Sequence, residues 1–249
     1  MNADPGKSDG SSFAHRRVIF ALDVSTLEET RRFVGLLKNR VGFFKVGLEL
    51  FTAFGKEAIR AVQEEGGRVF LDLKLHDIPN TVCRAAEEAV KLGVEMFNLH
   101  ATGGLEMMRE TGQRCRELAE KLTRPGPIIL AVTILTSLDE KNLKEIGLVG
   151  PVPERVVTLA ELAQRAGIDG VVASPKEIIP IRQRCGVQFI IVTPGIRPAF
   201  AEPGKDDQKR VMTAKEAISA GADYIVIGRP VRLAPDPAAA MDRVLEEIS

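Results

Sequence analysis

Charged side chains interrupt or end several short apolar stretches of this sequence. Asp23 ends VIFALD, Lys45 lies within FFKVG, Asp72 and Lys74 lie within VFLDLKL, and Asp77 follows just beyond. Because Asp72 and Lys74 are two residues apart, both side chains point to the same face of a strand. An unpaired buried charge is costly, so we expect these lysines and aspartates to compensate one another. An ammonium group held between carboxylates can stabilise a developing anion and donate a proton to it.

Each of these residues alone also allows a structural role. Asp77 and Asp23 could each cap the helix that follows, and Lys45 could extend from a sheet edge into solvent. Asp72 and Lys74 could form a solvated strand end. The common position of all these charges, at the same end of consecutive strands, favours the catalytic interpretation. His100 could line the same pocket, although a hydrogen-bonded core histidine is the expected role.

A second group of residues near the end of the chain has the chemistry of a phosphate site. The stretch DYIVIGR places Gly228 and Arg229 directly after an apolar run. Glycine leaves a backbone N–H accessible to a ligand, and arginine offers a forked donor that matches phosphate. Arg197 and Gln208, from the preceding irregular stretch, could contact the same anion, with Arg210 as the alternative to Gln208.

The elements that must position these residues alternate between short apolar runs and helical patterns. The candidate strands are Val18–Asp23, Phe43–Gly47, Val69–Leu75, Met96–His100, Ile128–Ile134, Gly170–Ala173, Phe189–Thr193 and Tyr224–Gly228. Helical patterns include Thr26–Asn39, capped by Ser25 or Thr26, Pro79–Leu92, ended by Gly93, and Pro237–Ile248. This alternation predicts an α/β protein, a single (β/α)8 TIM barrel over residues 17–249 after a disordered leader, residues 1–16. The alternative is a doubly wound open sheet.

The irregular stretch TPGIRPAFAEPGKDDQK, residues 193–209, follows the seventh candidate strand. A TIM barrel carries its active-site loops at this end, so the stretch predicts a mobile lid. The structural alternative is a disordered surface loop.

Composition narrows the classes of function further. The 249 residues carry 34 basic and 34 acidic side chains, a balance that argues against a broad nucleic-acid or anionic-membrane surface. The longest nearly apolar run, Ile128–Leu135, is far shorter than the roughly 20 residues that span a bilayer. Without a signal-peptide pattern at the start, we expect a soluble, cytoplasmic protein. Three scattered cysteines predict reduced packing residues, and three histidines make a histidine-rich metal site an unfavourable interpretation.

The run LDLKLHDIPNTV, residues 71–82, resembles the DxKxxDIPNT signature of the orotidine 5′-phosphate decarboxylase family. FALDVS, FFKVGLEL, VTILTS, TPGIRP and DYIVIGRP continue the resemblance in order over nearly the whole chain after residue 16. The resemblance implies a TIM-barrel enzyme that converts orotidine 5′-phosphate to uridine 5′-phosphate. This reaction is the last step of de novo pyrimidine nucleotide synthesis. The resemblance further implies that the enzyme uses no metal and no cofactor.

The resemblance also implies roles for single residues. Lys74 would protonate C6 of the pyrimidine, Asp72 would lie next to the substrate carboxylate, and Lys45 would lie beside Asp72. The second aspartate of the signature would reach the neighbouring subunit's site, which implies a homodimer. The residues of this segment are Asp77, Ile78 and Thr81. The remaining implied substrate contacts are Asp23 to ribose, Thr136 and Ser137 to the pyrimidine edge, and Arg197, Gln208, Gly228 and Arg229 to phosphate.

Two other functions remain open from the sequence. Sister barrels with the same DxKxxD core use magnesium, and the resemblance implies that they carry a carboxylate near the end of the second strand. This chain has Lys45 there. A non-catalytic barrel that binds a phosphate ligand predicts a missing proton donor, whereas Lys74 is present.

Overall fold

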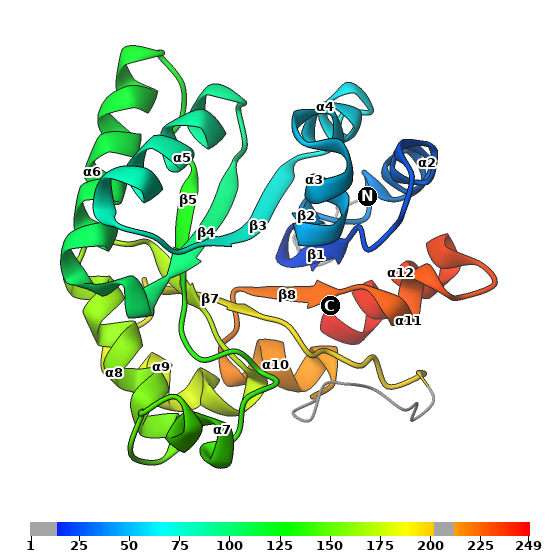
Figure 1. Cartoon of the computed structure of the whole chain (residues 1–249). Helices are drawn as coiled ribbons and strands as arrows, with labels where there is room; N and C mark the ends of the chain where they lie inside the picture. Colours follow the sequence, from blue (N-terminus) through cyan, green and yellow to red (C-terminus); the bar gives the residue numbers. More distant parts are fainter. Residues whose placement is uncertain (1–13, 202–211) are drawn as a thin grey trace, which may run out of the picture.

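The computed structural model describes residues 14–201 and 212–249. In this part of the chain, parallel strands close into a barrel in the order β1 to β8. Their bounds are β1 Val18–Ala21, β2 Phe43–Gly47, β3 Val69–Leu75, β4 Met96–His100, β5 Ile128–Val132, β6 Gly170–Val172, β7 Ile190–Thr193 and β8 Tyr224–Ile227. Figure 1 shows β1, in blue, beside β8, in orange, and these strands pair with Val18 opposite Ile225. The predicted TIM barrel is therefore confirmed, and the open sheet is excluded.

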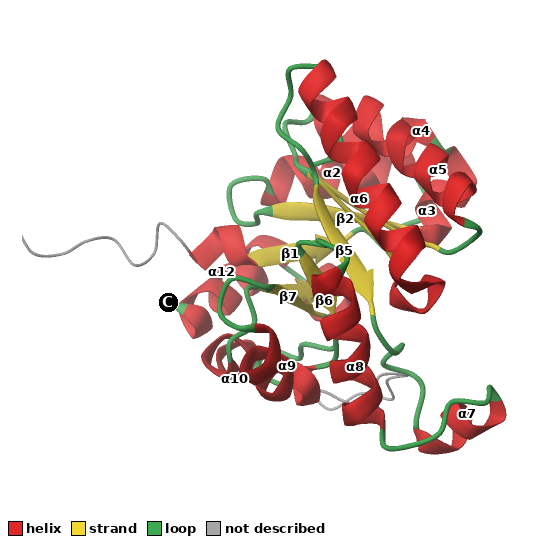
Figure 2. Cartoon of the chain, turned by 90° about the vertical axis from the view of Figure 1, so that its left-hand side faces the viewer, coloured by secondary structure: helices red, strands yellow, loops and turns green. Residues whose placement is uncertain are grey.

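Helices connect each strand to the next and lie around the outside of the barrel (Figure 2). The described α-helices are α2 Leu27–Leu37, α3 Leu48–Phe54, α4 Lys56–Glu64, α5 Pro79–Lys91, α6 Gly104–Lys121, α7 Glu140–Glu145, α8 Val152–Arg165, α9 Ile178–Cys185, α10 Ala214–Ala220, α11 Arg229–Arg232 and α12 Pro237–Ile248. Short 3-10 helices span η1 His15–Arg17, η2 Ala101–Gly103 and η3 Pro175–Glu177. The helical connection between parallel strands forces all eight strand ends to the same rim.

Local capping explains where two of the predicted helices begin and end. Thr26, and not Ser25, caps α2, because its hydroxyl oxygen accepts the N–H of Glu29 at 3.1 Å. Helix α5 ends at Lys91, and Gly93 follows with a φ of +73°, as a C-terminal glycine requires.

Apolar side chains fill the barrel interior, and the fully buried ones come from every strand except β6, which contributes the half-buried Val172. The buried side chains are Ile19, Ala21, Phe43, Phe70, Met96, Leu130, Val192 and Val226, with half-buried side chains packed against them. A much larger apolar layer fills the space between the strands and the helices. Because side chains alternate along a strand, the residue two positions further along points inward as well. On β2, β3 and β4 that residue is polar, namely Lys45, Asp72 and Asn98, and Asp23 holds the equivalent position just after β1.

The folded part of the chain begins before residue 17, the predicted start of the barrel. Ala14 is buried, with 4% of its surface exposed, and residues 15–17 form η1. Of the predicted leader, residues 1–13 lie outside the described residues, as do residues 202–209 of the predicted lid.

Two further predictions concern the core and membranes. Cys83, Cys115 and Cys185 are buried and form no disulfide, which confirms them as packing residues. Among the helices that the structure describes, none is long and apolar enough to cross a membrane.

Candidate active site

A cavity of about 260 Å3 opens at the carboxyl ends of the strands. Every strand or following loop except that of β4 contributes to its wall, as expected for the catalytic face of this fold. The lining residues are Ala21, Asp23, Lys45, Phe70, Asp72, Lys74, Val132, Ile134, Leu135, Thr136, Val172, Pro194, Gly195, Ile196, Arg197, Val226, Gly228, Arg229 and Pro230. Apolar and charged side chains share this lining, and the apolar ones strengthen electrostatic interactions between the charged ones.

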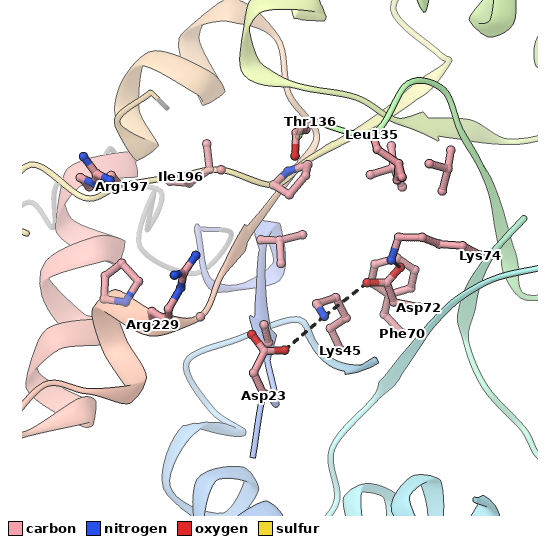
Figure 3. A pocket seen from close by; sticks show the side chains of 18 of the residues that line it. Asp23, Lys45, Phe70, Asp72, Lys74, Leu135, Thr136, Ile196, Arg197 and Arg229 are labelled. Carbon is pink, nitrogen blue, oxygen red and sulfur yellow. Dashed lines mark hydrogen bonds and ion pairs between the residues drawn. The ribbon is translucent and has the colours of Figure 1, made fainter. Parts of the chain in front are cut away.

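Four charged side chains of alternating sign form a continuous array along one wall (Figure 3). The ammonium nitrogen of Lys45 lies 3.5 Å from Asp23 Oδ1 and 3.3 Å from Asp72 Oδ2. Lys74 Nζ lies 2.7 Å from Asp72 Oδ1. The carboxylate of Asp72 therefore bridges two ammonium groups, and the expected compensation of charges is present.

The charges of the array set the ionisation of its buried members. Burial by itself would lower the pKa of Lys45, but the carboxylates of Asp72 and Asp23 outweigh it and hold this pKa above its ordinary value. Burial would likewise raise the pKa of Asp72, but the ammonium groups of Lys45 and Lys74 and the amide of Asn98 hold it below its ordinary value. Each group is thus kept charged by its neighbours.

The burial of Lys45 and Asp72 contradicts the solvated roles that their sequence positions also allow. The side chain of Lys45 is 14% exposed and that of Asp72 13%, so neither belongs to a solvated strand end or reaches out to solvent. Asp23 is half exposed and does not cap α2, because Thr26 does.

The backbone of β3 is irregular where it carries the array. Leu71 pairs with Phe97 and Leu75 with Leu99, so three residues of β3 lie opposite Asn98 alone. Within this bulge Lys74 has a φ of +54°, in the left-handed region that residues other than glycine rarely adopt. Asp72 and Lys74 do share the cavity face, as their spacing predicts, but they do so on a distorted strand.

Asn98 is a site residue that the sequence analysis missed. Its Nδ2 donates to Asp72 Oδ1 at 2.7 Å, and its Oδ1 accepts the backbone N–H of Lys74 at 2.8 Å. The available signal was a polar residue in the middle of the apolar run MFNLH, two residues after the inward-facing Met96.

The predicted phosphate residues that the structure describes line the opposite part of the cavity. Figure 3 shows Arg197 and Arg229 on one side and Asp72 and Lys74 on the other. Gly228 lies between β8 and α11, where a Cβ atom would be 3.1 Å from Ala21 Cβ. This contact is tight, so glycine keeps the cavity open. Gln208 and its alternative Arg210 lie outside the described residues.

The loop after β5 brings one of its two predicted residues to the cavity. Thr136 is half-buried in the wall, whereas Ser137 is exposed and is not part of the lining. Leu135, beside them, is 38% exposed and belongs to the wall.

The segment after β3 lies outside the cavity of its own chain. Asp77, Ile78 and Thr81 are exposed, and none is a lining residue. The carboxylate of Asp77 accepts the adjacent N–H of Ile78 at 2.7 Å, and Ile78 is the N-cap residue of α5, so Asp77 does not occupy the cap position. The structure thus separates these residues from the array of the same chain.

His100 lines no part of the cavity and instead packs against His76. The two ring centroids are 5.2 Å apart. Burial, followed by electrostatic interaction with the neighbouring His76 and Lys74, lowers the pKa of His100 to about 4. The imidazole is therefore neutral at physiological pH.

The donor set of the array disfavours a metal ion. Both oxygens of Asp72 are engaged, Oδ1 by Lys74 and Asn98 and Oδ2 by Lys45. A divalent cation there would meet two ammonium groups in place of carboxylates. Among residues 14–201 and 212–249, no cluster of three or more His, Cys, Asp or Glu side chains could hold a metal.

Comparisons with known proteins identify the family of this chain. The model of the Orotidine 5'-phosphate decarboxylase / HUMPS family matches residues 16–244. Orotidine 5'-phosphate decarboxylase of Geobacter sulfurreducens is 56% identical over 237 residues, which cover 94% of this chain and 97% of the relative. That of Pelobacter propionicus is 54% identical over 235 residues, 94% of this chain and 96% of the relative. The crystal structure of orotidine 5'-phosphate decarboxylase from Lactobacillus acidophilus superposes with a TM-score of 0.82 at 37% identity, covering 94% of this chain and 99% of that one. With its closed barrel and its charged cavity, the chain belongs to the Orotidine 5'-phosphate decarboxylase / HUMPS family.

Proposed function

We propose that this protein decarboxylates orotidine 5′-phosphate to uridine 5′-phosphate without a metal ion or a cofactor. The observation that carries the proposal is the ammonium group of Lys74, which lies 2.7 Å from the Asp72 carboxylate in the cavity wall. The relatives named above, each covered over nearly its full length, support the same activity.

The reaction breaks the bond between C6 of the pyrimidine and its carboxylate carbon. Carbon dioxide leaves, and the electron pair stays on C6 in the plane of the ring, where the ring delocalises it poorly. The ammonium of Lys74 stabilises this charge and transfers a proton to C6, and the resulting amine regains a proton from water.

Asp72 and Lys45 serve Lys74 in this proposal. The Asp72 carboxylate holds the ammonium of Lys74 and lies where the substrate carboxylate would enter, so its negative charge disfavours the bound carboxylate more than the carbanion. Lys45, tied to both Asp72 and Asp23, keeps Asp72 ionised when water leaves the cavity.

Binding of the phosphate supplies energy at a distance from the reacting carbon. Arg229, Gly228 and Arg197 form the proposed grip, and Gln208 is a proposed member of it that lies outside the described residues. A forked guanidinium can bind phosphate in a bidentate manner. Binding energy from this remote group can be used to order the site and exclude water around the ring.

Ribose and base take the space between these two ends of the cavity. Asp23 is the proposed ribose contact, because its half-exposed carboxylate lies next to Gly228 at the end of the array and pairs with Lys45. Thr136 is the proposed contact for the pyrimidine edge. Ser137 remains a proposed contact that would require the loop after β5 to move toward the cavity.

We also propose a homodimer in which the segment after β3 completes the neighbouring site. The exposure of Asp77, Ile78 and Thr81, together with their absence from their own cavity, supports this arrangement. An exposed isoleucine, 67% accessible, is the kind of side chain that a dimer interface buries. A cytoplasmic location remains part of the proposal.

The magnesium-dependent activity of sister barrels is the alternative within the same family. The ammonium of Lys45 occupies the space between two carboxylates, where such an enzyme would need a metal ligand. Turnover of orotidine 5′-phosphate should therefore be unchanged after dialysis against EDTA. Activity that disappears with EDTA and returns with magnesium would refute the metal-independent mechanism.

The decisive assay follows the loss of orotidine 5′-phosphate absorbance with wild-type protein and with Lys74→Ala. General acid catalysis contributes about 10^2- to 10^4-fold, and we expect the variant to lose at least that much turnover while it still binds uridine 5′-phosphate. Lys91→Ala is the matched control, since that lysine is half exposed and pairs with Glu88 on the surface of α5. A Lys74→Ala turnover within tenfold of wild type would remove Lys74 from the mechanism.

The phosphate grip is tested by Arg229→Ala. Loss of charged hydrogen bonds to phosphate should lower kcat/KM by about 10- to 100-fold. Arg31→Ala is the control, because Arg31 of α2 pairs with Glu64 of α4 and neither residue lines the cavity. Full catalytic efficiency of the Arg229 variant would contradict the proposed grip.

A further inference from the structure

We infer that Asn98 is a positioning residue for the reaction, one that fixes Lys74 and Asp72 relative to each other. The inference rests on the proposed function, because it assigns a role within the same array. It concerns a side chain that does not line the cavity and therefore acts through its neighbours.

The position of Asn98 explains why it can act from beneath the site. It is 1% exposed, and it points into the barrel two residues after Met96, a member of the apolar interior. A buried amide in such surroundings is tolerated when its polar atoms are paired. Its partners are Asp72 and the backbone of Lys74, at opposite ends of the same ion pair.

The two hydrogen bonds require both halves of an amide. The NH2 group donates to the Asp72 carboxylate at 2.7 Å, and the carbonyl oxygen accepts the Lys74 N–H at 2.8 Å. A carboxylate at this position could accept but not donate, and an aliphatic side chain could do neither. Asparagine therefore links the negatively charged member of the pair to the main chain of the positively charged one.

The bulge in β3 makes this link necessary. Three residues of β3 face Asn98 alone, and Lys74 is held at a positive φ. Such a conformation persists where surrounding contacts over-determine it. Asn98 holds the backbone N–H of Lys74, and Asp72 holds the ammonium group of the same residue. Rotation of the Lys74 backbone or of the Asp72 side chain would therefore break a hydrogen bond to the Asn98 side-chain amide.

Loss of the Asn98 amide should therefore lower turnover more than it weakens substrate binding. Asn98→Leu removes both hydrogen bonds and keeps a comparable volume. Since hydrogen bonds to charged groups correspond to about one to two powers of ten, we expect kcat to fall about 10- to 100-fold. The KM should change less than about threefold, because the phosphate grip is untouched.

Asn98→Asp gives a readout that a merely structural role would not produce. It keeps the acceptor for Lys74 but places a second carboxylate 2.7 Å from Asp72 Oδ1, where Asn98 Nδ2 now lies. The neighbouring charged groups are Asp72 and Lys74 on β3 and Lys45 on β2, and the titratable side chains of His76 and His100 lie next to each other near Lys74. Repulsion from Asp72 raises the pKa of the introduced carboxyl group. Once protonated, that group can donate to Asp72 as the amide did.

The experiment measures kcat and KM of wild type, Asn98→Leu and Asn98→Asp between pH 5 and 8. Across this range His100 stays neutral, because its pKa is about 4. Each rate is divided by the concentration of sites that bind uridine 5′-phosphate, so misfolded protein does not count. Thr111→Val is the control, because Thr111 is equally buried and donates to the Met107 carbonyl, and neither residue lines the cavity.

The expected result is a kcat ratio to wild type that is low and constant with pH for Asn98→Leu. For Asn98→Asp we expect the ratio to recover as the pH falls, with Thr111→Val near wild type throughout. The inference is overturned if Asn98→Leu stays within twofold of wild type per binding site, or if the Asn98→Asp ratio does not change with pH. Wild-type protein that fails to turn over orotidine 5′-phosphate would instead refute the proposed function.

Discussion

Asp72→Asn is the substitution that most directly tests how the charged array contributes to stability. It replaces the carboxylate between two ammonium groups, 3.3 Å from Lys45 and 2.7 Å from Lys74, by a neutral amide of the same size. The packing around residue 72 is therefore unchanged, and the measured effect reports on the loss of charge. Lys45 keeps one carboxylate partner, Asp23, at 3.5 Å.

The magnitude follows from the burial of each partner. Removing one member of a buried ion pair costs about 3–5 kcal/mol. Lys74 is 29% exposed and can turn toward water, which reduces its share, whereas Lys45 is 14% exposed and retains Asp23. We therefore expect the free energy of unfolding at pH 7 to fall by about 2–4 kcal/mol. Asp23→Asn is the matched control, and its half-exposed carboxylate should contribute about 0–1 kcal/mol.

The effect of Asp72→Asn should depend on pH with a defined sign. Burial alone would raise the pKa of Asp72, but Lys45 and Lys74 hold it below its ordinary value of 3.8. A carboxylate with a lowered folded-state pKa stabilises the protein above the unfolded-state pKa and loses this contribution as the pH falls through the folded-state value. The difference between wild type and variant should stay constant from neutral pH down to about pH 5 and narrow below about pH 4.

Guanidinium unfolding followed by circular dichroism measures these free energies. Circular dichroism is preferable to fluorescence because the sequence has no tryptophan and a single tyrosine. A variant as stable as wild type at pH 7 would refute the reasoning. A more stable variant would mean that the array is held at a net cost to folding, and a difference that persists unchanged at pH 3 would mean that the charge of Asp72 is not its source.

Three further predictions follow from buried groups. Gly170→Ala should lower the free energy of unfolding by about 1–3 kcal/mol, because the added Cβ would lie 2.5 Å from Ile190 Cβ, between β6 and β7. Urea titration measures this free energy. The pKa of His100 is lowered to about 4, so protonation of this residue opposes folding below its unfolded-state pKa, near 6.5. His100→Gln lacks this penalty and should unfold at a lower pH than wild type. An acid titration followed by circular dichroism measures the difference. Cys115, whose pKa burial raises to about 12, should resist iodoacetamide at pH 8 in the native protein and react after unfolding, as mass spectrometry would show; modification of the native thiol would contradict its burial.

The alternation of strands and helices and most of the charged array were predictable from the residues alone. Runs such as VIFA and FFKVG are short, apolar and β-branched or aromatic, while the segments between them repeat with the helical period, so local physics selects each element. A charge within such a run has few structural explanations, and for this reason Lys45, Asp72 and Lys74 could be assigned to the site before any contact was known.

Which neighbours these charges meet depends on the folded barrel and could not be predicted from local patterns. The bulge opposite Asn98, the left-handed backbone of Lys74 and the exclusion of Asp77 and Ser137 from the cavity depend on how strands and loops align once the barrel closes. Periodicity specifies which way a side chain faces along its own strand. It carries no information about the register between strands that are some 25 residues apart, such as β3 and β4, because that register is set by the packing of the whole barrel.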